Sequence, residues 1–214
     1  MIALRQFETS KMYTNTYICY DEETRDGFIL DIGECTEEIL DYVKRNNVKI
    51  RYIILTHGHF DHICGVADFL DLYPHALVIM HKDDIHMISD KTNLAYQNGE
   101  RVRPFKVDIG IESTKELDIC GMKVKFMSTP GHTSGSMVVM IDDYMFSGDT
   151  LFYHGIGATN FPTGNVAKMI SSISRIFCDL DKNYRIFPGH GNSTTIEHER
   201  EHSKFDQFAS YDPE

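Results

Sequence analysis

The segment THGHFDH occupies residues 56–62 and directly follows RYIIL (residues 51–55), a short apolar stretch typical of a buried strand. It contains four side chains that can bind a metal ion: His57, His59, Asp61 and His62. In an extended chain, alternate side chains project to one side, so the first three can converge, and a turn at Asp61 would bring the fourth beside them. Imidazole nitrogens and carboxylate oxygens suit zinc, and iron or manganese equally. The segment therefore predicts a metal-binding loop at the end of a strand.

Three further segments repeat one pattern, in which a strand is followed by a glycine-containing turn and a potential ligand. They are STPGH (128–132), FSGDT (146–150) and FPGHG (187–191), and they supply His132, Asp149 and His190. Glycine lets the backbone turn sharply and keeps bulk away from a ligand, as loops gathered at one edge of a sheet require. A single buried His or turn Asp is usually structural. Four such segments in one chain favour a common metal site.

Outward from these loops, strand-like and helix-like segments alternate along the chain. We predict strands over 2–7, 13–20, 27–31, 51–55, 76–80, 115–117, 122–128, 136–141, 144–146 and 184–187, the first three as an antiparallel set. We predict helices over 36–46, 65–72, 84–88, 166–176 and 195–208. The polar stretch 89–108 is either a binding loop or a mere connection. No linker or repeat interrupts the pattern, which indicates one α/β domain.

The order of the motifs, THGHFDH, TPGHTSG, SGDTLF and FPGHG, resembles that of the metallo-β-lactamase superfamily and, in detail, its glyoxalase II-like (hydroxyacylglutathione hydrolase-like) members. The resemblance covers residues 2–205. It implies a four-layer αββα sandwich with a dinuclear metal site between loops at one edge, and we expect residues 1–214 to form a single domain. The tail TTIEHER (194–200) is similar to the family's TTIGxER, with Glu197 where glycine is usual.

The resemblance also implies a role for each ligand. It assigns one metal ion to His57, His59 and His132, and the other to Asp61, His62 and His190. Asp149 would bridge the two ions, and Asp31, in the segment DIGE, would support the histidine loop from behind. We expect two divalent ions, with zinc as the first choice and iron or manganese as alternatives, and no organic cofactor.

The chemistry follows from such a site. Two divalent ions bridged by a carboxylate lower the pKa of a bound water towards 7, producing hydroxide at neutral pH. Asp61 and Asp149 would orient this hydroxide, as catalytic residues, for attack on a carbonyl carbon. A thiolate leaving group hardly needs a general acid, which agrees with the lack of a spare Lys, Tyr or His in the motifs. We predict hydrolysis of a small-molecule thioester or related ester.

Several branches of the superfamily fit less well. Flavodiiron oxygen reductases carry Glu where this chain has His59, classical β-lactamases lack the bridging Asp149, and the nucleases add a large domain and basic surfaces. Persulfide dioxygenases, which use one iron, stay open because they carry a segment similar to GIGATNF (155–161), where Ala158 and Asn160 here replace Arg and Asp. A non-catalytic metal-binding protein on the same scaffold is a third alternative, although all seven ligands are present.

The substrate's thiol is left open by the sequence. Full-length glyoxalase II enzymes bind glutathione through a C-terminal helical domain, whereas 214 − 190 = 24 residues follow His190, so we expect this domain to be lacking. Cys64 is interpreted as packing near the histidine loop, and His154 is a weaker candidate for a pocket residue. Six histidines have no motif context: His75, His81, His86, His154, His198 and His202.

Composition sets the remaining expectations. The 214 residues carry 21 Lys and Arg against 32 Asp and Glu, a net charge of −11, without any basic cluster, which disfavours nucleic acid as a partner. Five scattered cysteines form no CxxC pair and predict reduced thiols. Without a signal-like N-terminus or a long apolar run, we expect a cytoplasmic protein that does not enter the membrane.

Overall fold

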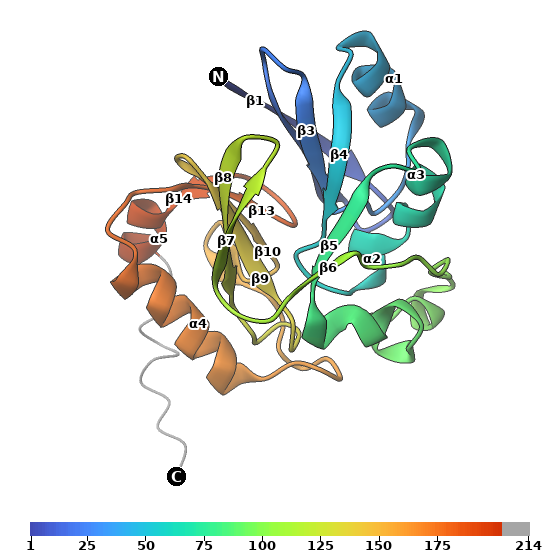
Figure 1. Cartoon of the computed structure of the whole chain (residues 1–214). Helices are drawn as coiled ribbons and strands as arrows, with labels where there is room; N and C mark the ends of the chain where they lie inside the picture. Colours follow the sequence, from blue (N-terminus) through green and yellow to red (C-terminus); the bar gives the residue numbers. More distant parts are fainter. Residues whose placement is uncertain (203–214) are drawn as a thin grey trace.

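The computed structural model describes residues 1–202, in which two six-stranded sheets pack against each other (Figure 1). The first sheet has the order β1-β2-β3-β4-β5-β6, and the second β14-β13-β10-β9-β8-β7. The strands of the first sheet are β1 (Ile2–Thr9), β2 (Thr14–Asp21), β3 (Asp26–Leu30), β4 (Lys49–Ile54), β5 (Leu77–His81) and β6 (Ile109–Ile111). Those of the second are β7 (Lys115–Ile119), β8 (Met122–Ser128), β9 (Met137–Ile141), β10 (Tyr144–Gly148), β13 (Arg185–Pro188) and β14 (Thr194–Thr195).

Helices cover the outer faces of both sheets (Figure 1). On the first sheet lie α1 (Glu37–Arg45), α2 (Phe60–Ile63) and α3 (Val66–Leu72), and on the second α4 (Val166–Asp179) and α5 (Ile196–His202). Three 3₁₀ helices, η1 (Lys82–Ile88), η2 (Lys91–Asn93) and η3 (Tyr96–Asn98), follow β5, and β11 (Leu151–Phe152) pairs with β12 (Gly155–Ile156) in a small hairpin. The predicted α/β four-layer αββα sandwich is confirmed.

The layers follow from strand periodicity. Neighbouring residues of a strand point to opposite faces, so Ile53 of β4 packs beneath the helices with Ile39 of α1 and Phe69 of α3. The next residue, Ile54, points the other way and packs with Phe126 of β8, between the sheets. Because both faces are buried at the end of β4, Ile53 and Ile54 follow each other without a polar residue, whereas Lys49 and Arg51 near its start are exposed.

The second sheet repeats this arrangement. Met169 and Ile173 of α4 pack against Val138 and Met140 of β9, while Val139 faces the first sheet. Without α4 on the second sheet, or α1 and α3 on the first, the outer face of that sheet would be exposed to water. The helical layers therefore hold each sheet rigid, and the strand ends that carry the motif loops share this rigidity.

The N-terminal expectations are confirmed. β1, β2 and β3 pair in antiparallel fashion. α1 begins after Thr36, whose hydroxyl accepts the N–H of Ile39 at 3.4 Å, as a helix-capping residue does. Strands β3, β4 and β5 pair in parallel, so their carboxyl ends lie at the same edge.

One local expectation is wrong. The segment 56–62 is not extended throughout, because α2 begins at Phe60. Asp61 and His62 therefore stand on the first turn of a helix rather than alternating with His57 and His59, and the helix rather than a strand turn brings His62 inwards. The short strands β6, β11, β12 and β14 were not predicted. The predicted helix 195–208 is confirmed as α5 up to His202, and its remainder lies outside the described residues.

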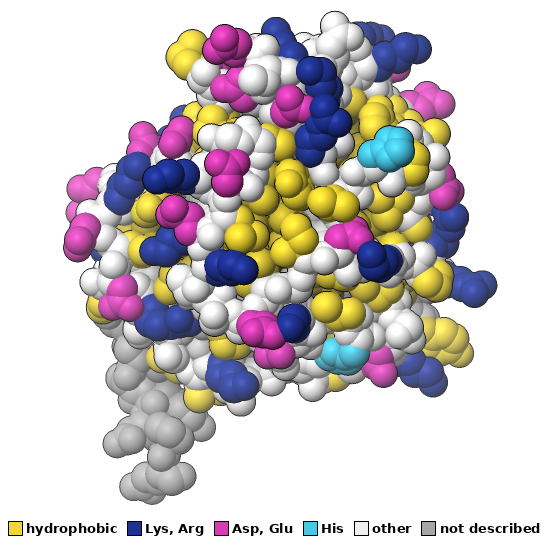
Figure 2. Space-filling model, in the orientation of Figure 1, with side chains coloured by type: hydrophobic (Ala, Val, Ile, Leu, Met, Phe, Trp, Pro, Cys, Tyr) yellow, Lys and Arg dark blue, Asp and Glu magenta, His cyan; other side chains and the backbone are white. Residues whose placement is uncertain are grey.

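The surface carries charged side chains of both signs. On the face drawn in Figure 2, Lys and Arg side chains are interspersed with Asp and Glu. Among the described residues, Arg51 pairs with Asp26 and Arg103 with Asp71. Within residues 1–202, none of the helices combines the length and the apolar character needed to cross a membrane.

Candidate metal centre

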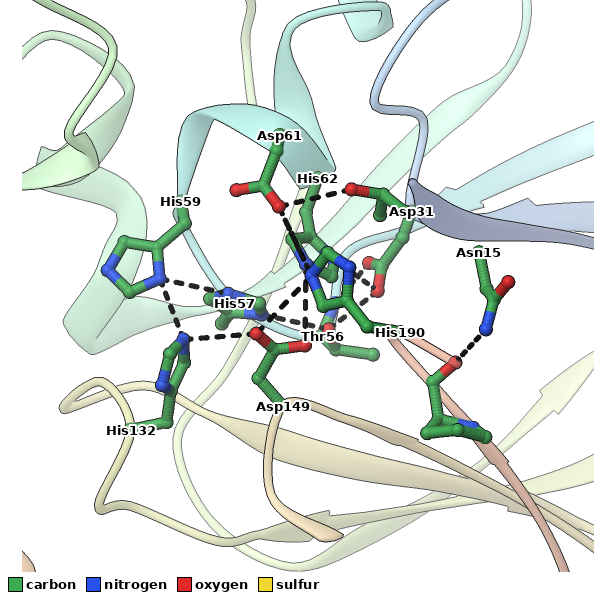
Figure 3. A network of polar contacts seen from close by, with 12 residues as sticks. Asn15, Asp31, Thr56, His57, His59, Asp61, His62, His132, Asp149 and His190 are labelled. Carbon is green, nitrogen blue, oxygen red and sulfur yellow. Dashed lines mark hydrogen bonds and ion pairs between the residues drawn. The ribbon is translucent and has the colours of Figure 1, made fainter. Parts of the chain in front are cut away.

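Five chain segments bring all seven predicted ligands together at one edge of the sandwich (Figure 3). His57 and His59 follow β4, Asp61 and His62 stand on α2, and the others follow β8, β10 and β13. Those three are His132, Asp149 and His190. Six of the seven are buried, and only the His190 side chain keeps 27% exposure. Five of the ligands thus follow the ends of strands, and the other two stand on the short helix that comes directly after the β4 loop.

The first half of the centre is the three-histidine group, His57, His59 and His132. His59 Nδ1 lies 3.1 Å from His57 Nε2 and 2.8 Å from His132 Nε2. Three nitrogens that face one point at these separations are close to the spacing around a tetrahedral cation, about 3.3 Å for bonds of about 2.05 Å. The group therefore suits one divalent ion.

The second half is the aspartate group, Asp61, His62 and His190. His62 Nε2 lies 3.3 Å from His190 Nε2 and 3.6 Å from Asp61 Oδ2, which is 3.2 Å from His190 Nε2. The Thr14 hydroxyl also donates to Asp61 Oδ2, at 3.1 Å, and ties this carboxylate to the start of β2. Mixed nitrogen and oxygen donors accept zinc, iron or manganese.

Asp149 lies between the two groups. Its Oδ2 is 3.3 Å from His132 Nε2 and 3.6 Å from His190 Nε2, while its Oδ1 is 3.4 Å from His62 Nε2. Asp149 Oδ1 is buried and has no hydrogen-bond partner among the described residues. A buried carboxylate oxygen without a donor is costly unless a cation pairs with it. The residues present therefore fit a pair of divalent ions with Asp149 between them.

Burial decides the protonation of the three-histidine group. Loss of solvation lowers the pKa of His57 well below its usual range, and the neighbouring His62 and His132 lower it further. Burial and His132 act on the pKa of His59 in the same direction. Both imidazoles are therefore neutral at pH 7, the state in which histidine binds metals.

The aspartate group has the opposite electrostatics. Burial alone would lower the pKa of His62, but the carboxylates of Asp61, Asp149 and Asp31 outweigh it and raise the pKa to about 10. The pKa of Asp61 is lowered by His62 and His190, against the effect of burial. Without a metal ion, a proton on His62 therefore balances these carboxylates.

Asp31 lies directly behind the ligands, the position that the family resemblance implies for it. Its fully buried Oδ2 accepts the Nδ1–H of His62 at 2.9 Å and the Thr56 hydroxyl at 2.7 Å, and its Oδ1 accepts the Thr56 N–H at 2.8 Å. The hydrogen bond to Nδ1 leaves Nε2 of His62 unprotonated and aimed at the centre once the extra proton leaves. Thr56 Oγ1 lies 3.1 Å from His57 Nδ1, so Asp31 also supports the three-histidine group indirectly, through Thr56.

Asp84 is a buried positioning residue that the sequence did not reveal. Its Oδ2 accepts the N–H of Gly58 at 2.9 Å and the hydroxyl of Thr133 at 2.6 Å, and its Oδ1 accepts the N–H of Gly135 at 2.6 Å. It thereby joins the loop of His57 to the loop that carries His132. Burial raises the pKa of Asp84 against these donors. In sequence it is the first residue of the helix predicted over 84–88, next to Asp83, and no local signal distinguishes the two carboxylates.

Two backbone features shape the centre. A Cβ on Gly189 would lie 2.2 Å from Asp149 Oδ1, so only glycine fits there, as the motif pattern predicts. His132 Nδ1 donates to the carbonyl oxygen of Ala158 at 2.7 Å. Ala158 therefore contacts His132 through its backbone, independently of its side chain.

A cavity of about 500 Å³ opens beside the aspartate group, with Asp61 and Phe60 in its wall. Its other walls come from residues 10–12, from residues 33–35 and from residues 98–101. Lys11 Nζ pairs with Glu100 Oε1 at 2.6 Å and links the β1–β2 turn to the loop 89–108. Part of that loop thus lines a cavity, as one of its two predicted roles requires. Cys64 also lines this cavity, whereas His154 lies elsewhere, bonded to His198.

Comparison with known proteins agrees with this geometry. The family model described as "Metallo-beta-lactamase superfamily" matches residues 12–190, most of the chain. The chain belongs to the metallo-beta-lactamase superfamily. As members of this superfamily bind divalent metals and are generally hydrolytic, the His and Asp groups fit a metal site of a hydrolase.

Three similar proteins refine the comparison. A hydroxyacylglutathione hydrolase of Prochlorococcus marinus is 33% identical over 163 residues, which cover 72% of this chain and 57% of that protein. The crystal structure of BLEG-1 B3 metallo-beta-lactamase superposes with a TM-score of 0.89 at 29% identity, covering 95% of this chain and 99% of that one. The structure of TTHA1623 in a di-iron-bound form has a TM-score of 0.83 at 25% identity, covering 94% and 99%.

Proposed function

We propose that this protein is a hydrolase with two metal ions that cleaves small-molecule thioesters. The observation that carries the proposal is the position of Asp149 between two complete groups of three ligands, with its buried Oδ1 lacking a hydrogen-bond partner among the described residues. In this proposal all seven predicted residues are ligands, and Asp61 and Asp149 are also the catalytic residues. When bound, such a metal pair supplies an activated water at neutral pH and polarises a carbonyl group.

The chain's own residues would then orient the reactants. Asp149 lies where its free oxygen can hold the attacking water by a hydrogen bond, and Asp61, fixed by Thr14, faces the cavity from the other side. Asp31 keeps His62 in the tautomer that binds metal. The motif segments contain no Lys or Tyr that could protonate a leaving group. This favours a thiolate, which leaves without a proton, over an alkoxide.

The similarity to a hydroxyacylglutathione hydrolase supports the thioester class. Because the match spans 57% of that protein, glutathione itself is one thiol among those to test. We propose zinc as the metal, and the di-iron form of a similar structure makes iron the alternative to measure. All five cysteines, which lie within the described residues, are unpaired, and on this ground we place the protein in the cytoplasm.

The test is a substrate panel on zinc-loaded and iron-loaded protein. It contains S-lactoylglutathione, an acyl-coenzyme A, an aryl ester, a lactone, a β-lactam and glutathione persulfide. We expect kcat/KM for a thioester to exceed that for the ester and the β-lactam. Oxygen consumption with the persulfide at one iron per chain would replace the proposal by a persulfide dioxygenase. Metal binding without turnover of any substrate would indicate a non-catalytic protein.

A further inference from the structure

A second histidine cluster lies outside the candidate metal centre. His154 stands in the turn between β11 and β12, and His198 and His202 lie four residues apart on α5. Residues at this spacing share one face of a helix. These three are among the histidines that have no motif context in the sequence, and the fold brings them together across 44 residues of chain.

The contact between His154 and His198 is unusually direct. Their Nε2 atoms are 2.8 Å apart, and the rings are within 6° of coplanar with centroids 5.0 Å apart. The two nitrogens therefore point straight at each other. Two protonated imidazoles would repel in this arrangement, so the pair needs a single shared proton or a cation between the nitrogens. A tetrahedral divalent ion needs the nitrogens about 3.3 Å apart, a small side-chain adjustment at an exposed position.

Two further donors adjoin this pair. His202 Nδ1 donates to the carbonyl oxygen of His198 at 3.0 Å, which leaves its Nε2 unprotonated, and its ring stacks on that of His198 with centroids 4.4 Å apart. His202 is not in the group of ligand atoms that lie within 4.8 Å of one another, and it instead covers one face of the His198 ring. An oxygen of Glu199 lies within 4.8 Å of the nitrogens of both His154 and His198.

Glu199 holds the site in place. Its fully buried carboxylate accepts the backbone N–H of His154 at 2.9 Å and the hydroxyl of Thr194 at 2.6 Å. His154 has a positive φ of 57°, which costs energy for a residue other than glycine unless such contacts compensate. The ring of Tyr153 stacks on that of His154 with centroids 4.0 Å apart. The histidine at this turn is thus held in position before any ligand arrives.

We propose that His154 and His198, with the Glu199 carboxylate beside them, form a separate site for a divalent ion of the zinc, nickel or copper class, and that His202 supports the His198 ring by stacking on it. Imidazole ligands favour these ions over magnesium or calcium. His198 and His202 have the HExxH spacing of helical zinc sites, but their rings stack instead of converging, so the site differs from that type. Its role is structural, because the ion would tie α5 to the hairpin that follows Asp149.

The test is the number of zinc ions bound at pH 7.5 and about 10 μM free zinc, measured by equilibrium dialysis of the full chain. We expect the wild type to bind one more ion per chain than His154→Gln or His198→Gln, and His202→Gln to weaken this ion about 10-fold. The matched control is His86→Gln, an exposed histidine of η1, which should bind as many ions as the wild type. Hydrolysis rates of all four variants should stay within twofold of wild type.

Nitrogen-15 NMR of the histidine side chains gives a second readout that does not depend on the total count. Added zinc should shift Nε2 of His154 and His198 and leave His86 unchanged. Equal zinc binding by wild type and His198→Gln, with no shift at these nitrogens, would show that the pair shares only a proton and would overturn the proposal. The test compares the zinc count of the wild type with that of each variant and does not use hydrolysis. The histidine-site proposal can therefore fail while the hydrolase proposal stands, and the hydrolase proposal can fail while the histidine site stands.

Discussion

The three-histidine group and the aspartate group both draw on the segment 56–62 but take their remaining histidine from different loops, and they differ in charge and support. His57 and His59 are buried and have lowered pKa values, so the three-histidine group needs no proton loss at these positions before it binds a cation. The aspartate group carries a carboxylate and a protonated His62, and its His190 side chain is 27% exposed. We infer that the three-histidine group fills first and that the aspartate group exchanges its proton for the second ion.

Asp149 joins the two groups, so its loss should have the largest effect. We expect Asp149→Asn to lower kcat/KM for a thioester roughly 10³-fold, since several kcal/mol of metal and charge organisation are removed. The variant should also bind one metal ion less. Asp83→Asn, at an exposed carboxylate with 64% side-chain exposure, is the matched control. Near-normal turnover with full metal content in Asp149→Asn would refute its bridging role.

Asp31 supports the aspartate group directly through His62 and the three-histidine group only through Thr56. Replacing it by Asn should weaken the second metal ion about 100-fold and the first by much less, since partners that orient ligands contribute about 10- to 100-fold. Competition with a chelator, followed for each ion in turn, measures both constants. An equal loss of affinity for the two ions would contradict the claim that Asp31 supports the aspartate group more directly than the three-histidine group.

Asp84 is the counterpart of Asp31 on the other side, but it touches backbone and Thr133 rather than a ligand. Asp84→Asn should weaken the first ion about 10-fold and leave the second nearly unchanged. An amide also places a donor against the buried N–H groups, so the melting temperature should fall. The conservative Asp84→Glu keeps the charge and tests geometry alone. A larger loss at the aspartate group than at the three-histidine group would contradict this assignment.

The pH dependence should separate the two groups as well. His62, with its pKa raised to about 10, is protonated in the metal-free chain at pH 7.5, so the second ion must displace this proton. Its affinity should rise with pH, by up to about tenfold per unit, between pH 7 and 10, while that of the first ion stays flat. The same shift stabilises the metal-free fold below about pH 6.5, and this contribution is lost as the pH rises through 10.

Calorimetry in two buffers with different ionisation enthalpies measures the protons released at pH 7.5. We expect at least one proton with the second equivalent of zinc, that of His62, and none from His57 or His59 with the first. Proton release on the first equivalent alone would reverse the order of filling. Release of none would show that His62 is neutral before the metal arrives.

The sequence predicted those parts of the molecule that depend on local patterns. The apolar run before His57, the glycine turns beside His132 and His190, and Thr36 at the start of α1 are visible in a few residues each. The mutual approach of the ligands could be expected because strand ends meet at one edge of the sandwich. The assignment of each ligand to one of two ions came from the resemblance to a family.

What the sequence could not supply depends on long-range contacts. Asp84 serves as a buried link only because β5 and η1 place it between two loops that are 77 residues apart at Gly58 and Gly135. The short helix α2 replaced the expected extended segment, since four residues carry too little periodicity to reveal a helix. The approach of His154 to His198 likewise exists only in the folded chain.

The most direct test of the central claim is a titration of thioester hydrolysis against zinc. Metal-free protein carrying His198→Gln, so that the proposed third site takes up no zinc, receives zinc in steps of a fraction of an equivalent. The account predicts little hydrolysis up to one equivalent per chain and a steep rise that ends at two. Full activity at one equivalent, with no change on further addition, would contradict a catalytic centre built from both groups.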